Sequence, residues 1–401
     1  MSGRAPTTTL ADVAELNPPL AASLADGDAV SFMPMAAVDA DSVTAVDRET
    51  RSYAEVRKGY TPFLDGDVLV AKITPCFENG KIAQVRISRR HGFGSTEFHV
   101  VRARGDRADS RYLAHFLRQA HIRKQGESRM TGSAGQRRVP EHFLAGLRLP
   151  LPPLPEQRRI AAILDKADAL RAKRRAALAQ LDTLAQSIFL DMFGDPAALG
   201  WRTATISHVA SQADGAIRTG PFGSQLLHEE FTDDGIAVLG IDNAVENEFR
   251  WGQRRFISEA KYRQLSRYTV RPGDVLITIM GTCGRCAIVP DDIPTAINTK
   301  HLCCITLDRT KCLPAFLHAY FLGHPIARRY LAQKAKGAIM EGLNMGIIKE
   351  MPIPLAPIDL QLEFAERLRR LSEHRAAQRR SEANLEALFA SLQHRAFRGE
   401  L

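Results

Sequence analysis

The chain has 401 residues, of which 45% are hydrophobic, and it carries a formal net charge of +9. This length exceeds what one ordinary hydrophobic core supports and suits two or three domains. The positive charge favours a polyanionic partner, although charge governs association and not the fold. The longest apolar run is well short of a membrane-spanning helix, and the N-terminus lacks a secretion signal. We therefore expect a soluble, cytoplasmic protein with reduced cysteines and no membrane partner.

Residues 1–148 predict a first domain of mixed α/β structure. An Asn-Gly pair separates the apolar runs 68–73 and 81–85, which is a strong signal for a β-hairpin. A further strand is expected at 98–101, and a short amphipathic helix at 111–119.

A proline-rich hinge and a long helix follow at residues 149–194. Proline lacks an amide hydrogen and disfavours helical structure in the residue before it, so the hinge ends the domain. The helix is expected from about 155 to 192, because its apolar residues recur with the heptad spacing of a coiled coil. The expected seam positions are Ile160, Ile163, Leu170, Leu181, Leu184 and Ile188.

The second half of the chain repeats this order. Residues 195–352 contain apolar runs at 275–279 and 301–305 and predict a second mixed α/β domain. Residues 353–401 contain a second hinge and a helix expected at about 358–396. Its seam positions are Phe364, Leu371, Leu385, Leu388 and Leu392.

The two halves are related by an internal duplication. The run from Leu149 to Pro155 before the first helix matches the run that starts at Ile353, 204 residues later. Leu164 matches Leu368 and Phe193 matches Phe397 at the same offset, and a fixed offset over a long stretch indicates a repeat. We expect an α+β fold of two domains, each followed by a long helix, with the helices paired as a coiled coil. The alternative is that each helix packs on its own globular segment.

Cysteine spacing leaves a metal site open as an alternative. Cys283 and Cys286 have the spacing of a zinc ligand pair, and Cys303 and Cys304 follow closely. Two of these four lie in apolar runs, where cysteine behaves as a small hydrophobic residue. We therefore expect no metal.

Catalytic motifs are incomplete in this chain. Asn17-Pro18-Pro19-Leu20 approaches the Asn-Pro-Pro-aromatic motif of amino-methyltransferases, but leucine replaces the aromatic ring that stacks on an extruded base. Asp67, Glu78 and Lys81 approach a nuclease set with unsuitable spacing. The sequence has no Gly-x-x-x-x-Gly-Lys-Ser/Thr phosphate loop. We expect no catalysis by this chain.

The order of several short motifs resembles the specificity subunits of Type I restriction-modification systems. The motifs that carry the resemblance are Pro150-Leu151-Pro152-Pro153-Leu154-Pro155-Glu156-Gln157, Thr219-Gly220-Pro221-Phe222-Gly223-Ser224, the stretch 59–81 and the terminal Ala396-Phe397-Arg398-Gly399-Glu400-Leu401. The second hinge departs from the fuller motif, and the first domain lacks the Gly-Pro-Phe-Gly-Ser loop. The halves have therefore diverged and should recognise different sequences.

This resemblance implies a function in recognition of double-stranded DNA. Each domain would be a target-recognition domain for one half-site, and the helices would form an antiparallel coiled coil that separates the two readers. The target would be bipartite and asymmetric. The chain would recruit two methyltransferase subunits and, in the full complex, restriction subunits. S-adenosylmethionine, ATP and magnesium would belong to those partners, with no cofactor bound by this chain.

Candidate DNA contacts are basic residues in predicted loops, together with the Gly-Pro-Phe-Gly-Ser loop. For each of them the alternative is a solvated surface charge. The candidates are Arg51, Arg57, Lys58, Lys72, Lys81, Arg129, Arg137, Arg138, Arg218, Thr219, Gly220, Phe222, Ser224, Arg250, Arg254, Arg255, Arg285, Lys300, Lys334 and Lys336. Basic residues on the first helix, such as Arg158 and Arg171, either follow the DNA backbone or form a solvent face.

A different class of function fits the same architecture. A coiled-coil scaffold with two protein-binding domains would need no DNA. Salt dependence separates the two hypotheses, because duplex binding weakens steeply with salt in a DNA-binding protein.

Overall fold

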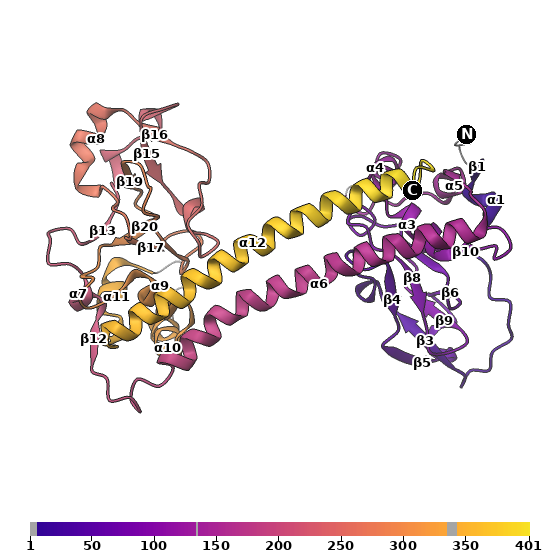
Figure 1. Cartoon of the computed structure of the whole chain (residues 1–401), viewed down its shortest axis with the longest axis horizontal. Helices are drawn as coiled ribbons and strands as arrows, with labels where there is room; N and C mark the ends of the chain where they lie inside the picture. Colours follow the sequence, from indigo (N-terminus) through magenta and orange to yellow (C-terminus); the bar gives the residue numbers. More distant parts are fainter. Residues whose placement is uncertain (1–5, 134, 335–342) are drawn as a thin grey trace. The chain divides into compact units, whose positions relative to one another are not determined.

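The computed structural model describes residues 6–133, 135–334 and 343–401. Two compact units make up the fold, and each is described by itself. Unit 1 comprises the chain up to Leu178 together with Ala377–Leu401, and unit 2 comprises Ala179–Ala376. Both boundaries fall inside long helices, α6 (Leu154–Phe193) and α12 (Ile358–Ala396), so each unit contains one globular segment and parts of both helices (Figure 1).

Unit 1 is built on two main sheets and a short two-stranded ribbon. Its strands are β1 (Thr7–Thr9), β2 (Ala14–Leu16), β3 (Ala29–Met33), β4 (Thr44–Val46), β5 (Glu49–Ser52), β6 (Thr61–Phe63), β7 (Val68–Ala71), β8 (Ile82–Arg86), β9 (Gly92–Gly94), β10 (Phe98–Ala103) and β11 (Arg148–Pro150). The orders are β2-β10-β7-β8-β4 and β5-β3-β9-β6, and β1 pairs with β11. Most neighbours are antiparallel, but β3 with β9 and β4 with β8 are parallel.

Short helices surround these sheets. They are α1 (Leu10–Val13), η1 (Met35–Ala37), α2 (Tyr53–Val56), α3 (Ser110–Leu117), α4 (Ala120–Glu127) and α5 (Glu141–Ala145). The predicted helix at 111–119 corresponds to α3, which begins where the Asp109 side chain accepts hydrogen bonds from the first amides of the helix. The predicted hairpin is confirmed as β7 and β8, in which Val68 lies opposite Gln84.

Unit 2 repeats this plan. Its strands are β12 (Thr203–Thr205), β13 (Ile217–Thr219), β14 (Phe231–Thr232), β15 (Ile236–Leu239), β16 (Phe256–Ile257), β17 (Val275–Thr278), β18 (Cys286–Ile288), β19 (Ala296–Asn298), β20 (Leu302–Ile305) and β21 (Pro352–Pro354). The sheet orders are β13-β20-β17-β18 and β14-β16-β15-β19, and β12 pairs with β21. Strand β17 lies between β20 and β18 as β7 lies between β10 and β8, and β15 with β19 is parallel as β3 with β9 is.

The helices of unit 2 also follow the first half. They are α7 (Ile206–Val209), η2 (Gly223–Gln225), η3 (His228–Glu230), η4 (Ile241–Asn243), α8 (Glu259–Leu265), η5 (Ser266–Tyr268), α9 (Pro314–Gly323), α10 (Pro325–Lys334) and α11 (Met345–Glu350). Within the part of the chain that the structure describes, none of the helices has the length and hydrophobicity that crossing a membrane requires.

In each unit the start of one long helix packs beside the end of the other. The core of unit 1 contains Ile160 of α6 and Ala396 of α12, and the core of unit 2 contains Phe364 of α12 and Phe193 of α6. The ring centroids of Phe193 and Phe364 are 5.4 Å apart. The helix segments therefore run antiparallel within each unit, as the resemblance implies.

The predicted seam is wrong at three positions. Leu170, Leu184 and Leu388 have exposed fractions of 54%, 42% and 51%. In unit 1 the helix segments meet through polar groups instead, because Arg171 Nη2 donates to Glu386 Oε2 at 2.5 Å while its guanidinium lies 4.2 Å from the ring centroid of Phe389. The start of each helix packs into the core of its own globular segment, as the alternative expects, whereas its end packs into the core of the other unit.

A partly buried histidine joins α9 to the sheet of unit 2. His318 Nε2 lies 2.9 Å from Asn247 O and 3.1 Å from Cys286 O, and because both atoms are acceptors the ring donates its hydrogen. Burial lowers the pKa of His318, although these two carbonyls oppose the shift. The folded protein therefore binds this proton less readily than the unfolded chain does.

We expect unit 2 to lose stability as the pH falls below about 6.5, because there the unfolded chain takes up a proton that folded His318 refuses. Above that pH, the contribution of neutral His318 to the stability of unit 2 is fully present. Thermal unfolding at pH 7.5 and 5.5 should show a lower midpoint at pH 5.5, and His318→Gln should reduce the difference. Exposed His208 supplies the control, since His208→Gln should leave the pH dependence intact. An equal reduction in both variants would contradict the assignment to His318.

Candidate nucleic-acid interface

Each unit has a sheet edge at which loops follow two corresponding parallel strands. In unit 2, Val238 of β15 pairs with Ile297 of β19, and the chain continues from these strands into 240–243 and 299–301. In unit 1 the corresponding strands β3 and β9 are parallel too. Parallel strands place their carboxyl ends at the same edge, so side chains from both loops meet there. Ligands commonly bind at such an edge in sheets with parallel strands.

The edge of unit 2 is hollowed into a groove of about 860 Å³. The side chains that matter for its chemistry are Phe231, Asp242, Arg254, Arg255, Thr299 and His301. Asp242 forms an ion pair with Arg255 at the base of the groove. Burial, followed by the charges of Lys300 and Arg255, lowers the pKa of His301, so the surroundings of this ring are positive on balance.

The corresponding edge of unit 1 carries different groups. Arg138 forms two hydrogen bonds to the carboxylate of Glu97, at 2.9 and 2.7 Å, and these bonds lower the pKa of Glu97. Lys81 Nζ donates to Met35 O at 3.1 Å. Lys72 adds positive charge near Glu97. The chemistry of the two edges therefore differs although the strands beneath them correspond.

The remaining candidates of unit 1 are spread over other surfaces. Arg51 lies 3.5 Å from the ring centroid of Phe32 and pairs with Glu49, and Arg57 pairs with Asp26 at 2.9 Å. Arg129 lies over the ring of Phe143. Lys58 is exposed and Arg137 is half-buried. The structure thus gathers Lys72, Lys81 and Arg138 near one edge and leaves the others outside it.

The prediction that Arg218 contacts DNA is wrong. Its side chain is buried and bonded to Asp274 Oδ2 and Thr269 O, both at 2.6 Å, so it is a structural residue and not a DNA contact. The sequence showed its basic charge beside the Gly-Pro-Phe-Gly-Ser loop but not the carboxylate that lies 56 residues further on. Neighbouring Thr219 is half-buried in β13.

Glycine at position 220 is required by a close approach of two backbone segments. A Cβ there would lie 1.9 Å from Asn298 O. The loop that follows exposes Phe222 and Ser224, which stay candidates for contacts.

Other basic candidates of unit 2 lie on its surface. Arg250 pairs with Glu246 at 2.5 Å, and Arg254 lies 5.4 Å from the ring centroid of Trp251. Arg285 is exposed and Lys300 is half-buried. Lys334 lies near the ring of Tyr330. Lys336 falls outside the described residues.

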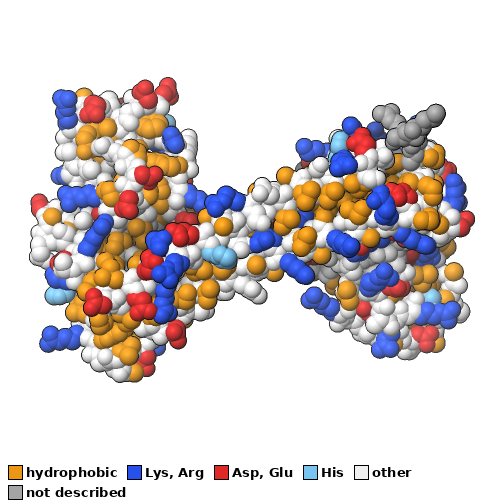
Figure 2. Space-filling view, in the orientation of Figure 1, with side chains coloured by type: hydrophobic (Ala, Val, Ile, Leu, Met, Phe, Trp, Pro, Cys, Tyr) orange, Lys and Arg blue, Asp and Glu red, His pale blue; other side chains and the backbone are white. Residues whose placement is uncertain are grey.

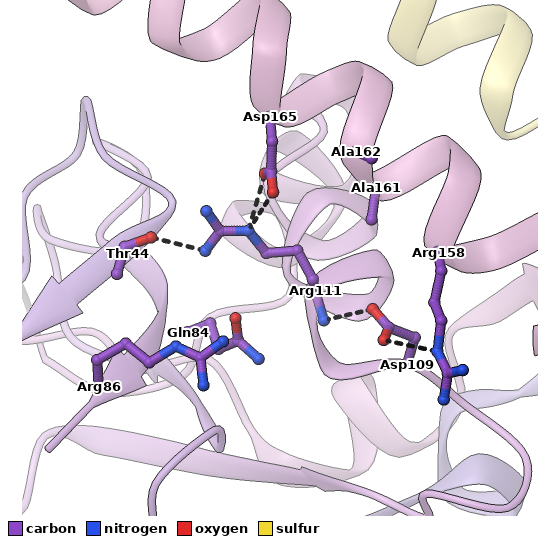
Figure 3. A pocket seen from close by; sticks show the side chains of 9 residues that line it. All are labelled: Thr44, Gln84, Arg86, Asp109, Arg111, Arg158, Ala161, Ala162 and Asp165. Carbon is purple, nitrogen blue, oxygen red and sulfur yellow. Dashed lines mark hydrogen bonds and ion pairs between the residues drawn. The ribbon is translucent and has the colours of Figure 1, made fainter. Parts of the chain in front are cut away.

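A second polar pocket lies in unit 1, where α6 meets the sheet (Figure 3). Arg111 occupies its centre and is already engaged, because Nε donates to Asp165 at 2.8 Å and Nη1 donates to Thr44 Oγ1 at 2.7 Å. Arg86 of β8 and Arg158 of α6 also line the pocket and have mostly exposed side chains. Arg86 was missed because it directly follows a predicted strand, and only the fold shows that its side chain is exposed beside the pocket.

Buried charges inside unit 1 fix α6 on the domain. His115 Nε2 lies 2.7 Å from Asp165 Oδ1, and burial lowers the pKa of His115. Burial opposes ionisation of Asp165 too, but the hydrogen bond from His115 and the charge of Arg111 lower its pKa on balance. Asp165 therefore stays ionised as the anchor between α3 and α6.

Several basic residues of α6 have partners as well. Arg159 pairs with Glu156 at 2.7 Å, and Arg171 also bonds Asp168 at 2.7 Å. On the face that Figure 2 shows, lysine and arginine side chains lie interspersed with acidic and hydrophobic ones in both units. Positive side chains on this face are thus mixed with other side chains and do not form a single patch.

The cysteines of unit 2 do not favour a metal. Cys286, Cys303 and Cys304 are buried, and burial raises the pKa of the Cys303 thiol to about 12. A metal ligand must be a thiolate, which such burial opposes. Among the described residues, no group of three or more His, Cys, Asp or Glu could hold a metal ion.

Comparison with known proteins finds a family model that matches the first part of the chain. Residues 7–180 match the family model of the Type I restriction modification DNA specificity domain. The matched stretch is less than half of the chain. Over residues 7–180 the match agrees with the resemblance drawn from the motifs.

Curated proteins that resemble the chain are specificity subunits of Type I restriction enzymes. Over 154 residues it is 43% identical to the Type I restriction enzyme EcoAI specificity subunit of Escherichia coli, a match that covers 38% of the chain and 26% of the relative. The EcoEI specificity subunit is 40% identical over 159 residues, with 39% and 27% covered. The chain thus spans about a quarter of the length of these relatives in the matched stretches. The EcoBI subunit is 26% identical over 304 residues, with 68% and 62% covered.

Solved structures support the fold alone. One solved structure is described as the structural basis of complex assembly and conformational transition of the type I R-M system. Its TM-score is 0.62 at 20% sequence identity, and the alignment covers 99% of this chain and 98% of that one. The S subunit of a Type-I restriction-modification system from M. genitalium has a TM-score of 0.56 at 13% identity, with 98% and 96% covered.

Proposed function

We propose that this chain is the DNA-reading subunit of a Type I restriction-modification complex. Each unit reads one half of a bipartite, asymmetric duplex target. The observation that carries the proposal is that two corresponding sheet edges present different side chains. Unit 2 offers Asp242, Arg255 and Thr299, whereas unit 1 offers Lys81, Glu97 and Arg138. Duplicated readers with different groups suit a target whose halves differ.

The chemistry of the complex belongs to partner subunits in this proposal. The residues of the nuclease-like set are engaged separately: Asp67 pairs with Arg102 at 2.7 Å, Lys81 bonds Met35 O, and Glu78 accepts from Thr74 Oγ1 at 2.7 Å. The amide of Asn17 is likewise bonded to His99, Glu141 and Val100. We infer that two methyltransferase subunits and restriction subunits supply catalysis and bind S-adenosylmethionine, ATP and magnesium.

The two long helices would set the unread gap between the half-sites. They contain 40 and 39 residues, or about 60 Å each at ~1.5 Å per residue. Helices of nearly equal length that run antiparallel within each unit suit a spacer. Spacing between half-sites is a geometric property of the protein in other DNA-binding dimers.

Selection of duplexes from a random library by the purified chain tests the proposal. The expected motif has two short specified blocks separated by a fixed unread gap. Exchange of residues 1–148 for those of a relative should change one block and leave the other, because each block is read by one unit. Changes in both blocks would contradict separate reading.

Salt dependence supplies the second readout. Binding should weaken about 10³-fold between 50 and 200 mM salt if about six phosphates are contacted. A scaffold that binds proteins through its two domains would enrich no motif and would show a flat salt dependence of any duplex binding. That result would favour the scaffold function instead.

A further inference from the structure

Two exposed hydrophobic residues of unit 2 follow strands that end at the same edge of one sheet. Thr219 of β13 and Ile277 of β17 both pair with Cys303 of β20, which lies between these strands. Both strands run antiparallel to β20, so the chain leaves them at the same edge. Phe222 and Met280 each follow three residues beyond this level, with exposed fractions of 51% and 40%. The strands that carry them are two strand spacings apart, about 10 Å.

The loop that carries Phe222 is fixed to the rest of unit 2 on both sides of that residue. Before it, the Gly220 amide donates a hydrogen bond to Thr299 O at 3.3 Å. After it, Gln225 Oε1 accepts a hydrogen bond from Tyr268 Oη at 2.8 Å. The backbone therefore presents the exposed ring of Phe222 from a fixed position. A group that is held in place before binding loses little freedom when it binds.

The loop that carries Met280 is fixed in the same way. The Ile279 amide donates a hydrogen bond to His301 O at 2.9 Å. Thr278 Oγ1 donates a hydrogen bond to Thr282 O at 2.5 Å and closes the loop on the other side of Met280. Both exposed hydrophobic residues therefore belong to loops that are bonded to the turn that precedes β20.

The two loops and the turn before β20 carry positive charge and no negative charge. They comprise residues 219–225, 279–285 and 299–301, which contain no aspartate or glutamate. Arg285 is exposed and Lys300 is half-buried. Exposed Arg267 lies beside the first loop, where its Nη2 is 3.5 Å from Gln225 Oε1. Exposed hydrophobic side chains among positive charges suit a polyanion that also presents apolar groups.

Duplex DNA presents one apolar group on the edges of its base pairs. In the major groove this group is the C5 methyl of thymine, which lies among hydrogen-bond donors and acceptors. The minor groove presents no methyl group. A hydrophobic side chain against a donor or acceptor would remove that group from water without a partner, which costs free energy. Against a thymine methyl group, the same side chain buries apolar surface and gains free energy.

We infer that Phe222 and Met280 read thymine, each by packing against the C5 methyl group of a thymine in the half-site of unit 2. This inference rests on the proposed function, since it names residues by which unit 2 reads DNA. The separation of β13 and β17 places the two contacts on different base pairs, because neighbouring base pairs are only about 3.4 Å apart. Arg285 and Lys300 supply positive charge to the phosphates beside these contacts.

Library selection with the full-length chain and its variants tests the inference. The block of unit 2 is the one that stays when residues 1–148 are exchanged, and it should contain A·T pairs. Phe222→Ala and Met280→Ala should each lower the preference for thymine at one position about three- to fivefold, because the contact with one methyl group is lost. The block of unit 1 should stay unchanged. Leu199→Ala is the matched control and should leave both blocks intact, because Leu199 has a similar exposed fraction of 53% but lies between α6 and β12.

Replacing thymine with uracil in the DNA tests the contact with the wild-type chain and does not depend on how a variant folds. Uracil pairs as thymine does but lacks the methyl group, so wild-type affinity should fall about fourfold at each thymine that is read. Phe222→Ala and Met280→Ala should each show no further loss at one of these positions. A block of unit 2 without A·T pairs, thymines that all tolerate uracil, or an undiminished uracil effect in both variants overturns the inference and leaves the proposed function standing. Absence of any motif with the wild-type chain defeats the proposed function itself.

Discussion

Replacing Asp274 with asparagine is expected to lower the free energy of unfolding of unit 2 by about 3–5 kcal/mol. The exposed fractions of the Asp274 and Arg218 side chains are 1% and 9%, and the two are 2.6 Å apart. Asp274 also accepts from the backbone amide of Arg271 at 2.9 Å and from Thr306 Oγ1 at 2.6 Å. Loss of its charge leaves the guanidinium of Arg218 buried without a counter-ion, which is the costly outcome for a buried pair.

The corresponding residue of unit 1 is the matched control. Asp67 follows the same kind of turn and pairs with Arg102, but the exposed fraction of the Arg102 side chain is 26%, so water can solvate it. Asp67→Asn should therefore cost less than Asp274→Asn. Urea unfolding followed by circular dichroism measures both. Tryptophan fluorescence isolates unit 2, because the two tryptophans of the chain, Trp201 and Trp251, belong to that unit. Equal losses in the two variants would contradict the role of burial.

This pair also shows where sequence reasoning ends. The apolar runs 68–73 and 275–279 predicted β7 and β17, because the pattern of a strand lies in its own residues. The fate of Arg218 depended on Asp274, a residue of another strand, and no local pattern encodes such a pairing. Local sequence patterns therefore predicted the strands and helices and their order. The ion-pair partner of each charged residue could be identified only in the three-dimensional fold.

The groove of unit 2 was only partly visible in the sequence for the same reason. Arg254 and Arg255 were candidates because they are basic, but Asp242 and Thr299 were not. The strands that bring them together, β15 and β19, are parallel and far apart in sequence, and each is only a few residues long. Such short strands carry little periodicity.

The long helices were predicted within a few residues of their bounds, but their seam was not. Heptad spacing identifies a repeating stripe and assumes that a second helix covers it throughout. Here the globular cores cover the ends of the helices, and Arg171 bridges Asp168 and Glu386 further along. Leu170 is exposed as a result. The apolar stripe thus predicted the helices correctly, but it assigned buried contacts to three residues that are exposed, Leu170, Leu184 and Leu388.

The glutamine at the start of each long helix makes the same set of buried hydrogen bonds. Gln157 is fully buried: Oε1 accepts from the amide of Asp109, and Nε2 donates to Arg107 O and Pro152 O at 3.0 and 2.8 Å. Gln361, its counterpart 204 residues later, makes the same three bonds to Leu313, Lys311 and Ala356. Each glutamine ties a hinge to the loop before α3 or α9.

Replacing Gln361 with leucine should lower the free energy of unfolding of unit 2 by about 3 kcal/mol, because three buried backbone groups lose their partners and each costs about 1–3 kcal/mol when unsatisfied. Gln157→Leu should cost unit 1 a similar amount. Tryptophan fluorescence should register the change at Gln361 and miss that at Gln157, whereas circular dichroism should register both. Exposed Gln180 of α6 is the control, since Gln180→Leu should stay within about 0.5 kcal/mol of the wild type. If Gln361→Leu matched that control, the hydrogen bonds would not explain why glutamine recurs at both helix starts.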